Sequence, residues 1–205
     1  MQKRQTETKR YIKEALTLLL RDKGFEDITI SDITRKAGIN RGTFYLHYQD
    51  KYDMMASLKE EILEQLYRIL IKGNFETDFY HIMNQTFSYL KDDFEFIQAI
   101  SKTSFVNFPK TIKDFVANFL LEFPQSKILI TEHYGVPYEY AIQVYLASIE
   151  SLISYWVATG GKESPAEMTE IISKVLKIEE SINQNTQNWT AARRFSFFWQ
   201  LNVWH

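Results

Sequence analysis

Residues 41–48, RGTFYLHY, bring a guanidinium, hydroxyls, an imidazole and a glycine together in one short segment. Phe44 and Tyr48 are four residues apart, so on a helix they share one face and can anchor the segment in a core. The opposite face and its flanks carry Arg41, Gly42, Thr43, Tyr45, Leu46 and His47. An arginine fork can donate to guanine O6 and N7, and an apolar side chain can contact a thymine methyl. This surface is therefore chemically suited to reading base edges in the major groove of DNA.

Two capped helices are predicted to position this segment. Thr29 followed by Asp32 is typical of a capping box that starts a helix, and Gly38 suits the left-handed residue that ends it. Asn40 can cap a second helix, predicted from residue 41 to about residue 48. A helix, a short glycine turn and a second short helix form the helix-turn-helix pattern, whose second helix lies in the major groove. The alternative is an ordinary helical hairpin with a solvated polar face.

Longer helices are predicted on both sides of this pattern. One runs from about Thr6 to Lys23. The other is capped by Asp50 and runs from about Lys51 to Ile71, with an apolar stripe of Met55, Leu58, Ile62, Leu66 and Ile69. Lys51 then lies in the first turn of its helix, where free N–H groups and the helix dipole attract phosphate.

Five stretches resemble the DNA-binding domain of the TetR/AcrR family of bacterial transcriptional regulators: GFEDITI at 24–30, DI at 32–33, AGI at 37–39, GTFYLHY at 42–48, and Lys51. The resemblance implies an all-α protein. Its N-terminal three-helix helix-turn-helix domain is followed by a helical ligand-binding and dimerisation domain. We expect the DNA contacts to come from Thr29, Ser31, Arg41, Gly42, Thr43, Tyr45, Leu46, His47 and Lys51. Within this set, Lys51, His47 and either Tyr45 or Thr43 are expected at phosphates, and Arg41 at bases.

A second resemblance lies near the C-terminus, in YWV at 155–157, GG at 160–161 and ESPAEM at 163–168. These stretches are similar to a C-terminal subgroup that includes regulators of dihydroxyacetone kinase operons. We expect a DNA-binding domain at residues 1–50, linked through the helix at about 51–71 to an effector-binding and dimerisation domain at 51–185. Residues 186–205 do not resemble the family. They are an extra packing segment, or residues from an altered reading frame or an expression vector.

Composition describes a soluble globular protein, with 45% hydrophobic and 24% charged residues in a chain of 205. The sequence has no cysteine, which excludes disulfides and agrees with a cytoplasmic location, as does an N-terminus without an apolar signal-peptide core. The net charge is −2, but residues 1–51 carry +4 and the remainder −6. A basic head on an acidic body fits a protein that places one end on phosphate.

The middle of the chain is rich in aromatic residues, with helices predicted at about 77–91, 93–104 and 109–132. Pro109 is suited to the first position of its helix, and Pro124 is expected to kink or split it. Most of these rings are expected to form core. The alternative is a pocket between helices for an apolar or aromatic effector, for which the candidates are Phe87, Phe105, Phe119 and Trp156.

The segment Ala141–Ala158 is nearly apolar and long enough to raise a membrane helix, but Gln143 and Glu150 argue against one. We interpret it as a helix buried on two faces, one of them covered by a partner subunit. The family resemblance implies that it and the helix at 165–177 pair with their copies in a four-helix bundle. The expected dimer contacts are Ala141, Val144, Tyr145, Ser148, Leu152, Met168, Ile171, Ile172 and Val175.

Enzyme chemistry has little support, since the four histidines (47, 81, 133 and 205) are scattered and phosphate loops and nucleophile motifs are absent from the sequence. We expect no catalytic residue, no metal and no cofactor. The leading interpretation is a homodimeric repressor that a small-molecule effector releases from a palindromic DNA operator. Two alternatives remain open. One is the same fold controlled by a protein partner without a small-molecule pocket, and the other is a DNA-binding protein of chromosome organisation.

Overall fold

The computed structural model describes residues 2–73 and 75–176, and for residues 2–6, 75 and 76 it describes the backbone alone. These residues form ten α-helices and one 3-10 helix without any strand, so the all-α prediction is confirmed. The elements in chain order are α1 (Gln2–Asp22), η1 (Phe25–Asp27), α2 (Ile30–Ala37), α3 (Arg41–Tyr45), α4 (Lys51–Lys72), α5 (Phe75–Asp92), α6 (Phe94–Ser101), α7 (Phe108–Leu121), α8 (Gln125–Tyr134), α9 (Tyr138–Ala158) and α10 (Pro165–Val175). The expected tail at 186–205 lies outside the described residues.

Side-chain caps set the boundaries of the N-terminal helices, as their sequence predicts. Thr29 and Asp32 form a capping box at the start of α2, and Gly38 ends it at a φ of 69°. The Asn40 side chain accepts from the backbone N–H of Thr43 at 2.7 Å and starts α3. Asp50 accepts from two N–H groups of the first turn of α4, both at 2.8 Å. These caps satisfy backbone donors that a helix start leaves without an intrahelical partner.

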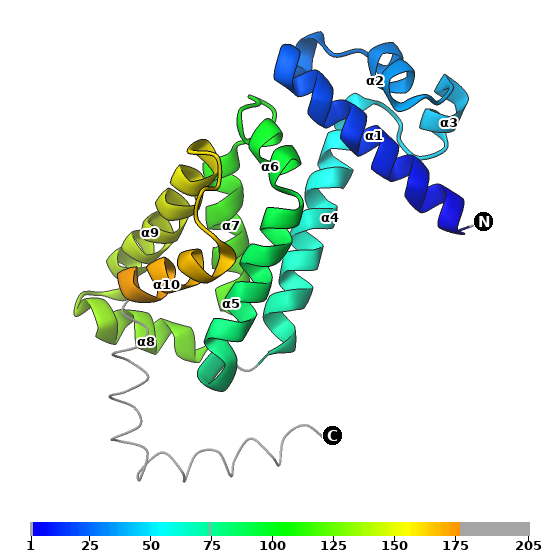
Figure 1. Cartoon of the computed structure of the whole chain (residues 1–205). Helices are drawn as coiled ribbons and strands as arrows, with labels where there is room; N and C mark the ends of the chain where they lie inside the picture. The colour runs from blue at the N-terminus through cyan, green and yellow to red at the C-terminus, as the bar shows by residue number, and fades with distance from the viewer. Residues whose placement is uncertain (1, 74, 177–205) are drawn as a thin grey trace.

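The helices form two regions joined by α4 (Figure 1). The first three helices lie together at one end of the molecule, and α4 runs from them into a body formed by α5–α10. Within the body, α5 packs against α4 and α10, whereas α9 packs against α6, α7 and α8. The two regions also meet directly, because α1 packs on α6. One cluster of buried side chains extends from Ile12 in α1 to Leu176 after α10.

Several predicted boundaries differ from the structure. The recognition segment is helical only to Tyr45, so the predicted extension to residue 48 is wrong; residues after it form a turn that leads into the Asp50 cap. The buried residue at the end of α4 is Leu70, while Ile69 is half-buried. The segment at 109–132 splits at Pro124 into α7 and α8, as expected. Pro109 occupies the second position of α7, because that helix begins one residue earlier.

One described helix, α9, is long and apolar enough to cross a membrane, judged by length and composition. A single helix of this kind is weak evidence for a membrane protein, since helices of soluble proteins share these properties. It packs against four helices of the body, α6, α7, α8 and α10.

Candidate nucleic-acid interface

The short helix α3 has one face buried in the core and the opposite face exposed. Phe44 is fully buried and Tyr48 is 3% exposed, with their ring centroids 5.7 Å apart. On the other side, Tyr45 is 49% exposed and Leu46, directly after the helix, is 80% exposed. A large apolar side chain so exposed beside a rigid anchor is a candidate contact surface. The face expected from the sequence is therefore present on the molecular surface, with Arg41 and Gly42 also exposed.

Neighbouring side chains restrict the shape of this face. The Nη2 of Arg41 donates to the hydroxyl of Tyr45 at 3.3 Å, and the Tyr45 ring stands edge-on to Phe44 at 5.6 Å. The hydroxyl of Thr43 donates to the side-chain oxygen Oδ1 of Asn40 at 3.0 Å. A methyl group at Gly42 would lie 3.3 Å from that same oxygen, so glycine leaves room for the cap.

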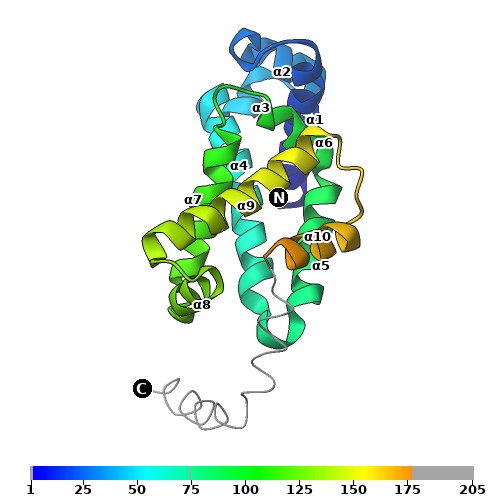
Figure 2. The same ribbon diagram turned by 90° about the vertical axis from the view of Figure 1, so that its left-hand side faces the viewer.

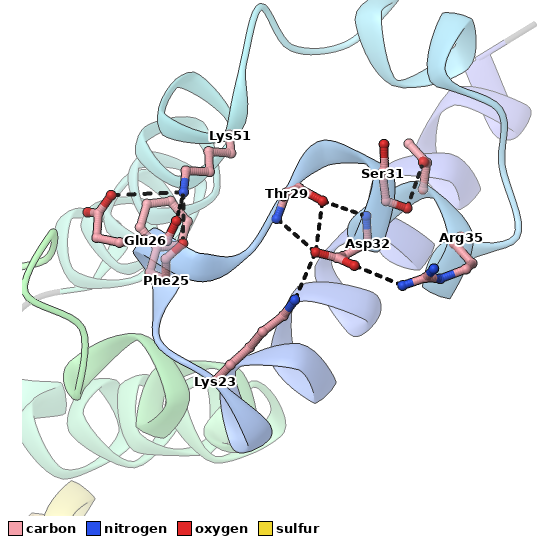
Figure 3. A network of polar contacts seen from close by, with 9 residues as sticks. Lys23, Phe25, Glu26, Thr29, Ser31, Asp32, Arg35 and Lys51 are labelled. Carbon is pink, nitrogen blue, oxygen red and sulfur yellow. Dashed lines mark hydrogen bonds and ion pairs between the residues drawn. The ribbon is translucent and has the colours of Figure 1, made fainter.

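The start of α2 is a polar network centred on Asp32 (Figure 3). Its carboxylate accepts from the backbone N–H and the hydroxyl of Thr29 at 3.0 and 2.8 Å, and it pairs with Lys23 and Arg35, both at 2.8 Å. The hydrogen bond from Lys23, followed by those from Thr29, holds the pKa of Asp32 well below its usual range. Thr29, a predicted DNA contact, therefore already uses its hydroxyl in the cap.

Other polar residues of α2 remain available to a ligand. The side chain of Ser31 is exposed. Arg35 and Lys36 in the last turn are exposed cations that the predicted contact set does not contain. Arg35 follows Ser31 by four residues and so lies on the same helix face. This spacing could have identified Arg35 as a candidate contact from the sequence.

Lys51 departs from its expected role as a phosphate contact. Its ammonium donates to the carbonyl oxygens of Phe25 and Glu26 at 3.0 and 2.7 Å, and its side chain is 13% exposed (Figure 3). The same ammonium lies 5.0 Å from the centroid of Phe25 and 5.1 Å from that of Tyr52. Because its donors point into the protein, Lys51 ties α4 to η1, which argues against the expected phosphate contact. The sequence could not show this, because the acceptors are backbone carbonyls 25 and 26 residues away.

His47 completes the predicted contacts. The His47 side chain is half-exposed and its ring lies 6.2 Å from that of Tyr48. It is close enough to the exposed face to remain a predicted phosphate contact. The side chains of residues 2–6 lie outside the described part of the protein.

The outer side of α9 presents a shallow depression (Figure 2 looks onto this helix). Val144 and Val175 are about half-exposed, at 48% and 47%. The lining residues are Gln143, Val144, Ala147, Ser148, Ser151, Leu152 and Val175. The Ser148 hydroxyl donates to the Val144 carbonyl at 2.9 Å, so it presents less polarity to the outside. Four of the predicted dimer contacts thus lie on one open surface.

The other predicted dimer contacts divide into two groups. Ala141, Met168 and Ile172 are at most 2% exposed, because they pack inside the protomer, and their assignment to a subunit interface is wrong. Tyr145 and Ile171 are half-buried against the protomer core. Helical spacing identified apolar residues correctly but could not tell which of two apolar faces meets the protomer's own helices.

The four aromatic residues proposed for an effector pocket do not come together. Phe87 and Trp156 are each 1% exposed and in edge-on contact at 5.6 Å, so they are filled core. Phe119 contacts Tyr67 on α4. Phe105 lies next to the DNA-binding helices and is 41% exposed. These four rings therefore do not line one pocket, because aromatic content predicts packing without its location.

A capped helix, a glycine turn and a short anchored helix with an exposed polar and aromatic face define a helix-turn-helix DNA-binding protein. The family models agree: residues 12–58 match bacterial regulatory proteins of the tetR family, and residues 77–178 match a transcriptional regulator C-terminal region. The chain belongs to the TetR family of transcriptional regulators.

Individual relatives agree with this family. The chain is 28% identical over 190 residues to the HTH-type transcriptional regulator YxbF of Bacillus subtilis (strain 168), a match that covers 87% of this chain and 45% of YxbF. The chain thus spans less than half the length of this curated relative.

Two solved structures share the fold. The dihydroxyacetone kinase operon activator DhaS has a TM-score of 0.58 at 18% identity, covering 85% of this chain and 97% of DhaS. A TetR transcriptional regulator from Streptococcus agalactiae 2603V has a TM-score of 0.60 at 18% identity, covering 85% of this chain and 96% of its own. At these identities the likeness concerns the fold alone.

Proposed function

We propose that this DNA-binding regulator is a homodimer that recognises a palindromic operator and represses transcription from it. The observation that carries the proposal is the face of α3, where Arg41, Tyr45 and Leu46 point outward above the buried ring of Phe44. On one exposed face, guanidinium and phenol groups can donate to acceptors of base pairs, and an alkyl group can contact a thymine methyl. The caps of α2 and α3 hold this face in a fixed position on the protein.

The depression on α9 supports the dimer. Its lining is mostly small or apolar and open to the outside, and small side chains allow two helices to approach closely. A twofold axis there brings two copies of α9 together and gives two copies of α3 for two half-sites. Two half-sites in a palindrome then lie about one helical turn, ~34 Å, or a multiple apart.

Repression follows when a bound dimer covers a promoter, and its release requires a change in the separation of the two recognition helices. An effector that binds only the mismatched conformation shifts the population away from DNA, by no more than its differential affinity. DhaS is described as an activator. A reporter gene placed behind the operator therefore has to detect both repression and activation.

A second candidate is control by a protein partner. The packing of Phe87 against Trp156 favours it, because two of the rings proposed for an effector pocket are filled core. A preformed operator complex can be titrated with the small-molecule fraction and, separately, the macromolecular fraction of a bacterial extract. Release by the small-molecule fraction supports an effector, and release by the macromolecular fraction alone supports a partner.

Selection from random double-stranded DNA tests the main proposal. The expected product is a palindrome of two half-sites, bound by two chains per duplex in light scattering. A single half-site bound by one chain contradicts the dimer. Occupancy of many dispersed chromosomal sites, instead of one or a few promoters, supports the chromosome-organising alternative.

A further inference from the structure

An aromatic ring of the body packs against η1 and the start of α4. Phe105 belongs to the loop between α6 and α7, and its ring centroid is 5.4 Å from Phe25 and 5.5 Å from Tyr52. Phe25 and Tyr52 are themselves in edge-on contact at 5.6 Å. The three rings therefore join the body loop, η1 and the start of α4. In Figure 1 this loop lies at the end of the body that faces the DNA-binding helices.

Polar contacts also join η1 to the start of α4. Lys51 donates to the carbonyl oxygens of Phe25 and Glu26, and its ammonium lies over the rings of Phe25 and Tyr52. The hydroxyl of Tyr52 donates to the Glu26 carboxylate at 2.7 Å. Since η1 leads directly into the Thr29 cap of α2, these contacts connect the three rings to the start of α2.

The loop that carries Phe105 is itself well held. The hydroxyl of Thr103 donates to the Ile100 carbonyl at 2.8 Å and accepts from the Val106 N–H at 3.3 Å. Val106 is 5% exposed and anchors the loop in the core. Phe105 thus projects from a restrained loop, although its own side chain is 41% exposed.

Ion pairs hold the neighbouring helix to the same DNA-binding region. Lys13 pairs with Asp93 at 2.6 Å, just before α6, and Arg21 pairs with Glu95 at 2.7 Å. The exposed Arg21–Glu95 pair contributes little, whereas the Lys13–Asp93 pair is 23% and 28% exposed and also restrains the two regions. Ring packing at Phe105 is less sensitive to salt and constrains direction, because aromatic pairs favour defined geometries.

We propose that Phe105 is a positioning residue for DNA recognition, which sets the orientation of the helix-turn-helix on the body without contacting DNA. In the homodimer proposed above, on which this part rests, that orientation sets the distance between the two α3 faces. Phe105 then determines which spacing of half-sites is bound.

The orientation can be measured in the full chain without DNA. The chain has no cysteine, so spin labels at Asp22→Cys and Glu132→Cys report the distance between α1 and α8. Dilution with unlabelled protein isolates the distance within one protomer. Phe105→Ala is expected to broaden the distance distribution, and Phe105→Tyr, which keeps the ring, to retain the narrow one.

Phe115→Ala is the matched control, because Phe115 is a half-buried ring of α7 that packs into the body core. It lowers stability without removing a contact to η1, so its distribution should stay narrow. Broadening in both alanine variants, or in neither, overturns the role of Phe105.

Binding to duplexes with different half-site spacings gives the functional readout. Phe105→Ala is expected to reduce the preference for the best spacing about three- to tenfold, the effect of losing one or two aromatic contacts. The salt dependence should stay unchanged, since phosphate contacts remain. An unchanged spacing preference in this variant overturns the proposal. A wild-type protein without any preferred spacing contradicts the proposed dimer instead, while the label distances still test Phe105.

Discussion

The Nη2 of Arg41 lies 3.3 Å from the hydroxyl of Tyr45, one helical turn further along α3. The phenol stands edge-on to the buried ring of Phe44, so the hydrogen bond directs the guanidinium along the exposed face of α3. A side chain already ordered loses less entropy when it binds. This relationship lowers the cost of the base contact that is predicted for Arg41.

Arg41→Ala is expected to weaken operator binding by about 1–3 kcal/mol and to relax the preference at one position of each half-site. Selection from random DNA, followed by affinity measurements, tests both parts. Arg68→Ala serves as control, because Arg68 is an exposed, ion-paired arginine of α4. If the base preference at every position of the site is unchanged while affinity for all sequences falls equally, Arg41 contacts phosphate.

Leu46 is expected to contact a thymine methyl. Leu46→Ala should lower affinity by about 1 kcal/mol with little change in folding stability, since the side chain is 80% exposed. Uracil in place of the contacted thymine should have a similar effect. Combining the two changes should cost no more than either alone, because they remove the same contact. Full additivity at every thymine would rule the contact out.

Lys51→Ala is expected to lower the free energy of unfolding by about 1–3 kcal/mol, because two hydrogen bonds from a charged donor to carbonyl groups are lost. The slope of log affinity against log salt should remain that of the wild type. Lys36→Ala, at an exposed cation of α2, is the comparison. A slope reduced by about one per half-site in Lys51→Ala restores its role as a phosphate contact.

Ala147→Glu and Val144→Glu are expected to convert the proposed dimer to a monomer, since each places a charge in the depression on α9. Light scattering at micromolar concentration measures the mass. Leu121→Glu introduces the same charge at a 77% exposed position of α7 and should leave the dimer intact. A dimer retained in both α9 variants places the interface elsewhere.

Asp32→Asn is expected to destabilise the protein near neutral pH, because it removes the charged partner of Lys23 and Arg35. The pKa of Asp32 is lowered on folding, so its ionised form stabilises the native state above the unfolded pKa. That contribution is lost as the pH falls below about 4 and approaches the folded pKa. Thermal unfolding midpoints of wild type and variant should converge over that range. A constant difference at all pH values contradicts an electrostatic origin.

The sequence by itself determined the local features of the DNA-binding region. Thr29, Gly38, Asn40 and Asp50 act through hydrogen bonds and backbone angles within a few residues of their own positions, so their roles can be read without knowing the fold. The burial of Phe44 and the exposure of Leu46 follow in the same way from their spacing near one helix.

Tertiary structure decided which partners each side chain meets. Lys51 turned inward because two carbonyl groups of η1 lie beside it, and Met168 was buried because α10 packs on α5. Phe105 reached the DNA-binding region instead of a pocket. Periodicity gives the apolar faces of a helix, but which face meets which neighbour depends on helix packing across long sequence separations. That packing alone separates protomer core, junction and open surface in this protein.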